Sequence, residues 1–264
     1  MMLFDYPGAW QILLVAVVLG SFLSLLGIPL LLEKRSFTGV ALSQTSALGA
    51  VVASVVGVYA DILAFIFTLG ALLLLEWVDR ERKDDSRVAL LFIISAALST
   101  LIVSWMPTGE ADLLTIQFGN ILSILPEEAI LSLIVGVLGI GGYLLVYKPF
   151  LVVINDYTTA KSIGHRPRLI QGVYSVLLAL GITLGLKIFG VVLVFAFLIV
   201  PAFIMFRFSS KLKIWAVAGI IFTAVVTVAG LFLAFAFDFP PGVFIAAVLG
   251  LLGIVCWIAF RKRI

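Results

Sequence analysis

The stretch Phe37–Gly57 reads FTGVALSQTSALGAVVASVVG and, as a helix, is long enough to cross a lipid bilayer. Its first half nevertheless carries five hydrogen-bonding side chains, more than any other apolar stretch of this length in the sequence: Thr38, Ser43, Gln44, Thr45 and Ser46. In hydrocarbon such groups are unfavourable without partners, so they face other helices, water or a substrate path. What these five groups face therefore bears directly on what the protein does.

The composition is typical of a helical membrane protein. Of the 264 residues, 63% are hydrophobic and only 12% are charged, whereas about a quarter of the residues in a soluble protein are charged. The net charge of +3 is scattered over the loops, which predicts no nucleic-acid partner. We therefore predict an all-α integral membrane protein, embedded in the lipid bilayer, in which residues 1–264 form a single transmembrane domain.

The apolar pattern predicts about nine transmembrane helices. They lie at about Ala9–Leu32, Phe37–Gly57, Ile62–Trp77, Val88–Met106, Ala129–Tyr147, Leu169–Leu186, Ile188–Phe206, Ile214–Phe237 and Val243–Phe260. A further apolar run, Leu113–Leu125, lies between Pro107 and Pro126 and is too short to span a bilayer. A run of this length is predicted to be interfacial or re-entrant.

The positive charges predict the orientation of these helices. With the N-terminus outside and the C-terminus cytoplasmic, the inner loops contain every Lys and Arg among the 17 in the chain except Lys187. These loops are residues 33–36, 79–87, 148–168, 207–213 and 261–264. Because cytoplasmic loops carry the excess of Lys and Arg, this orientation is strongly favoured over its reverse.

The sequence carries none of the common motifs of a catalytic or nucleotide-binding site. It lacks the G-x-x-x-x-G-K-[ST] phosphate loop, the H-E-x-x-H pair and the G-x-S-x-G nucleophile turn. Its single histidine, His165, cannot build a histidine-rich metal site, and Cys256 has no second cysteine to pair with. We predict no catalytic residue, no metal site and no cofactor bound by this chain, which favours a transport subunit over an enzyme.

One inner loop, 155–168, reads NDYTTAKSIGHRPR and has the pattern of a short capped helix. Asp156 can cap a helix through Tyr157–Ile163, with Gly164 as its C-terminal stop and Pro167 just beyond. The loop is then either a polar connection with an incidental helix or an element that docks on a cytoplasmic partner. The candidate docking residues are Asp156, Tyr157, Thr158, Thr159, Ala160, Lys161, Ser162, Ile163 and Gly164.

Four segments resemble the permease subunits of ABC importers that take up zinc, manganese or iron. The segment Leu186–Phe208 (LKIFGVVLVFAFLIVPAFIMFRF) resembles the family pattern GxLLVxALLVIPAA, and Phe237–Gly242 (FDFPPG) resembles LDLPxG. The segment Ala111–Ile124 (ADLLTIQFGNILSI) resembles DLLxxLFGNILxV, and Leu151–Arg168 resembles the family's ATPase-contacting helix. The matches follow the family order from about residue 15 to 250.

The resemblance implies an assembly in a prokaryotic cell membrane. Two copies of the permease would form a homodimer, and two cytoplasmic ATPase subunits would bind ATP and supply the energy. An extracellular or periplasmic substrate-binding protein would deliver the substrate. The residues by themselves agree on three points: no nucleotide site, an inner docking helix, and polar groups within a membrane helix.

The opening stretch departs from the family pattern GDALSHAVLPGVAL, in which Asp and His are associated with metal passage. This chain reads GVALSQTSALGAVVA, so that Val40 replaces the Asp and Gln44 replaces the His. Carboxylate and imidazole bind a divalent metal well, whereas valine cannot bind it and a neutral amide oxygen is a weak, hard ligand.

Several readings of these polar residues remain open. Ser43, Gln44, Thr45 and Ser46 could line a path for a divalent metal, or a path for a metal chelate or another small polar solute. They could instead hold helices together, which is the ordinary role of Ser and Thr in membrane helices. A membrane scaffold without transport activity is the alternative from another class.

Overall fold

The computed structural model describes residues 8–78, 85–106, 109–164, 166–209 and 211–260, and over these ranges the chain forms helices and turns without a β-strand. The all-α prediction is therefore confirmed. The helices are α1 (Ala9–Leu32), α2 (Ser36–Val56), α3 (Ala60–Val78), α4 (Asp85–Ser104), α5 (Gly109–Phe118), the 3₁₀ turn η2 (Ile121–Ser123), α6 (Pro126–Asn155), α7 (Tyr157–Ser162), α8 (Pro167–Phe208), α9 (Leu212–Ala236) and α10 (Pro241–Ala259).

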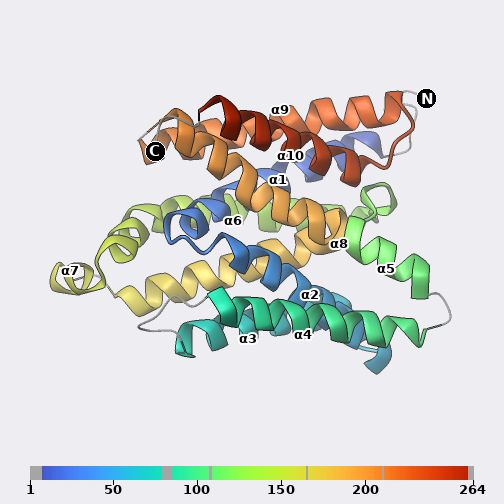
Figure 1. Cartoon of the computed structure of the whole chain (residues 1–264), viewed down its shortest axis with the longest axis horizontal. Coiled ribbons are helices and arrows are strands. Elements are labelled where there is room, and N and C mark those ends of the chain that lie inside the picture. Colours follow the sequence, from blue (N-terminus) through green and yellow to red (C-terminus); the bar gives the residue numbers. More distant parts are fainter. Residues whose placement is uncertain (1–7, 79–84, 107–108, 165, 210, 261–264) are drawn as a thin grey trace.

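Within the described ranges, seven helices are long and apolar enough to cross a membrane: α1, α2, α4, α6, α8, α9 and α10. One of them, α8, contains two of the predicted segments, because Gly190 interrupts it with the non-helical angles φ 73 and ψ 172. The halves before and after Gly190 run in opposite directions (Figure 1). The remaining predicted segment corresponds to α3, which is not among the seven, so the count of nine crossings stays a prediction.

The boundary predicted after Tyr147 is wrong. Helix α6 continues to Asn155 through Pro149, although Lys148–Arg168 was expected to be a polar stretch between helices. The reason is burial: Phe150 and Val153 are both 4% exposed in the core, so the apolar side of this extension is packed against the rest of the molecule.

The connections between helices gather at two opposite ends of the molecule (Figure 1). Helix α7, the α1–α2 and α8–α9 connections and the last turn of α10 lie at one end. Helix α5, the α2–α3 and α9–α10 connections and the Gly190 turn of α8 lie at the other. These two groups correspond to the loops predicted to be cytoplasmic and external, respectively.

Helix α1 forms the centre of the bundle. It packs against α8, α9 and α6, and its residues from Leu19 to Leu30 are all buried. Gly27 permits the closest of these crossings, because a Cβ at this position would overlap the carbonyl oxygen of Leu198 in α8. By contrast, α4 and α6 keep large apolar side chains such as Leu98 and Leu138 exposed, which is typical of a surface that faces lipid.

Three glycines join α5 to the turn of α8 and to the start of α10. Gly119 and Gly190 have positive φ angles of 72 and 73, and a Cβ on either would overlap the backbone of the other segment. A Cβ on Gly242 would lie 2.6 Å from the carbonyl oxygen of Phe118. Three of the four family-like segments therefore meet at one backbone junction, which fixes the end of α5 against the bundle.

Candidate functional site

Two of the polar side chains of α2 donate hydrogen bonds to carbonyls of their own helix. The Ser43 hydroxyl donates to the Gly39 carbonyl at 2.9 Å, and the Thr45 hydroxyl donates to the Ala41 carbonyl at 2.8 Å. Ser95 of α4 lies 3.1 Å from the Thr45 oxygen. Since the Thr45 proton is already used, Ser95 is the donor in this contact, and the bond ties α2 to α4.

The Ser46 hydroxyl is buried and has no hydrogen-bond partner within the described chain. The Thr38 hydroxyl, near the start of α2, is likewise buried without a hydrogen-bond partner in the described chain. A substrate-path role for Ser43, Thr45 and Ser46 stays a prediction, because none of the three lines the cavity described next.

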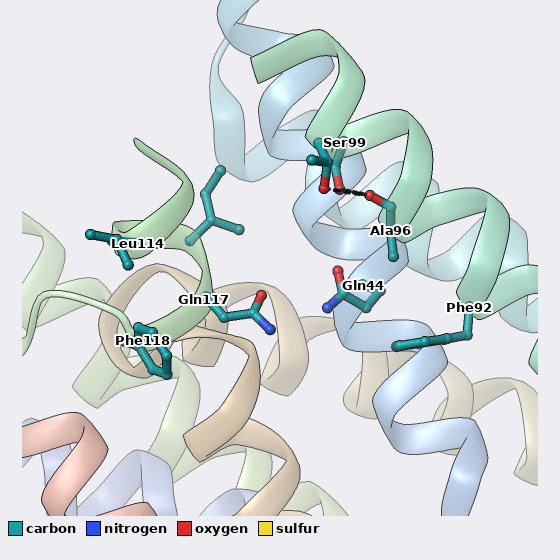
Figure 2. A pocket seen from close by; sticks show the side chains of 9 residues that line it. Gln44, Phe92, Ala96, Ser99, Leu114, Gln117 and Phe118 are labelled. Carbon is teal, nitrogen blue, oxygen red and sulfur yellow. Dashed lines mark hydrogen bonds between the residues drawn. The ribbon is translucent and has the colours of Figure 1, made fainter. Parts of the chain in front are cut away.

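Gln44 is placed differently from its neighbours. It is only 7% exposed, yet its side-chain amide points into a cavity of about 400 Å³ between α2, α4 and α5 (Figure 2). The polar residues that line the cavity are Gln44, Ser99, Thr100 and Gln117, and the apolar ones are Phe92, Ala96, Leu114, Ile116 and Phe118. Ser99 and Thr100 donate to the Ala96 carbonyl at 3.0 and 2.8 Å, which leaves their oxygens able to accept.

Gln117 extends into the same cavity from the last turn of α5, on the side opposite Gln44 (Figure 2). The sequence predicts that Leu113–Leu125 is interfacial or re-entrant, but it does not single out Gln117. One signal was present: the family pattern DLLxxLFGNILxV has a leucine at this position. Ser99 and Thr100 were also missed, because in sequence they are ordinary polar residues of an apolar helix.

The described side chains that line the cavity offer no charged ligand for a metal. None of these lining residues is ionisable, and the described ranges hold no group of three or more His, Cys, Asp or Glu residues that could bind a metal ion. Amides and hydroxyls can hydrogen-bond to water or to a ligand's polar shell, but they cannot neutralise a positive charge.

An ion-pair network lies at the external end of the bundle. The Lys187 ammonium of α8 is 3.2 Å from Asp61 of α3 and 2.9 Å from Glu128 of α6. Lys187 was the one basic residue that the predicted topology placed outside, and it forms ion pairs with two carboxylates there. The network also joins three helices at one point.

Helix α7 begins at Tyr157, as the sequence predicted, and ends at Ser162, one residue before the predicted end at Ile163. The Asp156 carboxylate accepts hydrogen bonds from the backbone N–H groups of Thr158 and Thr159 at 2.8 and 3.1 Å, and also from the Thr159 hydroxyl. These bonds, with that from the Thr159 hydroxyl largest, lower the pKa of Asp156 from its usual value. Only Ala160 is buried, and α7 lies at the far edge of the molecule (Figure 1).

A model of the family described as the ABC 3 transport family matches residues 5–260. The chain therefore belongs to the ABC 3 transport family, whose members are transport permeases. It is a multi-pass protein of the prokaryotic plasma membrane.

Proteins with similar sequences are named as membrane proteins of metal transport systems. The chain is 27% identical over 260 residues to the manganese transport system membrane protein MntC of Listeria monocytogenes, which covers 98% of this chain and 91% of the relative. It is 27% identical over 262 residues to a probable iron transport system membrane protein of Haemophilus influenzae, which covers 98% of this chain and 92% of the relative.

Among solved structures, PsaBC from Streptococcus pneumoniae in complex with Fab has the same fold. Its TM-score is 0.84 at 23% sequence identity, and the match covers 97% of this chain and 92% of the other. The structural likeness extends over nearly the whole chain.

Proposed function

We propose that this protein is the membrane-spanning permease subunit of an ABC importer for a divalent transition metal, with manganese as the first candidate and iron as the second. The observation that carries the proposal is the family match over residues 5–260, which leaves almost no part of the chain outside the permease domain. The relatives named for manganese and iron transport support the choice of substrate class.

The proposed assembly contains two copies of this chain, cytoplasmic ATPase subunits that use ATP, and an external binding protein that delivers the metal. In it the chain crosses the membrane nine times, with its N-terminus outside. The clustering of α7 and the basic connections at one end supports this orientation (Figure 1). The ion-paired Lys187 at the opposite end supports it as well.

Helix α7 is the element proposed to contact the ATPase. It is held by its own N-terminal cap and projects from the predicted cytoplasmic end, with Tyr157 43% exposed and Ile163 62% exposed. Exposed apolar side chains on a capped helix suit insertion into a groove of a partner. Deleting Asp156–Gly164 should abolish co-purification with the ATPase, and an intact complex after the deletion would contradict this role.

The transport function is tested by metal accumulation in cells with and without the gene. Cells are grown under limitation of manganese, iron or zinc in turn, and their metal content is measured by mass spectrometry. Loss of the permease should lower accumulation of manganese, iron or both by several-fold, with restoration by the intact gene. Unchanged accumulation of all three metals would overturn the proposal.

A further inference from the structure

Two glutamines face one another across the cavity between α2, α4 and α5, and neither makes a hydrogen bond within the described chain (Figure 2). Gln44 comes from the middle of α2 and is more than nine-tenths buried. Gln117 comes from the end of α5. A buried amide without a protein partner is costly unless water or a ligand satisfies it, so the pair is suited to a polar occupant.

Both amides are held on fixed supports. The Thr45–Ser95 hydrogen bond of 3.1 Å joins α2 to α4 next to Gln44. Gln117 lies two residues before Gly119, whose backbone is in contact with the Gly190 turn of α8. The backbone positions that carry the two amides are therefore set by packing between helices, which favours a preorganised binding site.

The neutrality of the cavity limits the form in which it can accept a metal. Removing the water shell of a divalent ion in a low-dielectric site costs far more than neutral amides return, so bare ions are held by charged ligands. Among the residues whose side chains the structure describes, none that lines this cavity is ionisable. A metal that keeps its own ligands presents O–H donors and polar acceptors instead, which amides and hydroxyls bind well.

The size of the cavity agrees with such an occupant. An octahedral shell of about six waters, at roughly 30 Å³ each, fills roughly 180 Å³. The cavity volume is about 400 Å³, which accommodates a complete water shell or a small chelator around the ion. A single dehydrated ion would fill only a small part of it.

We propose that Gln44 and Gln117 form a hydrogen-bonding pair that binds the transported metal with its ligand shell intact. This inference rests on the proposed metal transport. The two glutamines also stand where the family patterns have a histidine and a leucine, so the chain differs from its family on both sides of the same cavity. The shell is supplied either by water or by a small chelator.

The test uses an exchange-inert complex, hexaamminecobalt(III), whose ammonia ligands do not leave and therefore mimic a complete water shell. It is titrated calorimetrically into the purified permease with its ATPase subunits, in parallel with aqueous Mn²⁺ and with Mn²⁺ in excess citrate. Binding of the cobalt complex indicates a water shell, and binding of the citrate complex alone indicates a chelated substrate.

The variants Gln44→Met and Gln117→Met keep the side-chain volume and remove the amide. Each should weaken binding about tenfold, the effect of losing about one hydrogen bond. Gln11→Met, at an exposed position of α1 away from the cavity, is the matched control and should bind as the unmodified protein does. Gln44→Asn keeps an amide and serves if Gln44→Met does not fold.

Binding of aqueous Mn²⁺ without binding of either complex would overturn the inference, because the site would then accept only a dehydrated ion. Equal binding by both methionine variants and the control would overturn it as well, as would binding of none of the three ligands. None of these results touches the proposed function, which depends on metal accumulation in cells.

Discussion

Gly27 of α1 lies directly against the backbone of Leu198 in α8, so closely that a Cβ at Gly27 would overlap the Leu198 carbonyl oxygen. Gly27→Ala should therefore force the two central helices apart and destabilise the protein by about 3 kcal/mol. Thermal stability in detergent, followed by size-exclusion chromatography, should fall. Gly70→Ala in α3 is the matched control, since a Cβ there meets no atom within 4 Å. Equal stability of the two variants would contradict the close crossing.

A second prediction concerns the stability of variants at Gly190, in the turn of α8. Gly190→Ala combines a φ of 73 with overlap against the backbone of Gly119, whereas Gly57→Ala has a φ of 77 and no atom within 4 Å. The Gly57 variant should lose only the strain of the left-handed conformation, about 1–2 kcal/mol. The Gly190 variant should lose clearly more, in a comparison of thermal unfolding. Similar losses would show that α5 does not pack against this turn.

The ion pairs of Lys187 should contribute modestly to stability. The Lys187 side chain is 40% exposed, so Lys187→Gln is expected to cost about 1 kcal/mol or less. The double variant Lys187→Gln/Asp61→Asn should cost less than the sum of the two single changes, because each removes the same contact. High salt should shrink this coupling. Strict additivity at low salt would mean that the pair is not formed.

The cap of α7 predicts a dependence on pH. Hydrogen bonds from Thr159 and Thr158 lower the pKa of Asp156 from the unfolded value of 3.8. The stabilisation of α7 is therefore complete above that value and is lost as the pH falls through the lowered pKa. Hydrogen exchange of residues 157–162 should rise relative to the rest of the chain in this acidic window.

Two substitutions separate the charge of Asp156 from its capping role. Asp156→Asn keeps an oxygen that can cap the helix but does not titrate, so exchange of α7 should lose its acidic transition. Asp156→Ala removes the cap and should increase exchange of α7 at neutral pH. Identical exchange profiles for the aspartate, asparagine and alanine forms would show that the cap has no role in α7.

The orientation can be tested with single cysteines and a membrane-impermeant maleimide. Tyr59, between α2 and α3, is 81% exposed at the predicted external end, and Lys161 of α7 is exposed at the predicted cytoplasmic end. In intact cells Tyr59→Cys should react, and Lys161→Cys should react only after permeabilisation. The native Cys256 is buried and provides the background. The reverse labelling pattern would contradict an external N-terminus.

The sequence by itself determined that the chain is built of apolar helices, most of them long enough for a bilayer. The reason is that hydrocarbon offers no hydrogen bonds to the backbone, so each spanning segment must satisfy its own N–H and C=O groups as a helix. The cap at Asp156 was readable for a similar reason, since its partners at Thr158 and Thr159 lie within one turn. Such local rules do not depend on the rest of the fold.

Only the tertiary structure decided what the polar groups of α2 face. Ser43 and Thr45 bond to their own helix, while Gln44 meets a cavity whose opposite side is formed by Gln117, more than seventy residues later. That meeting depends on how far each helix is rotated and how closely the helices approach. Those quantities are set by distant contacts, such as Gly119 against Gly190, and no spacing within a single segment encodes them.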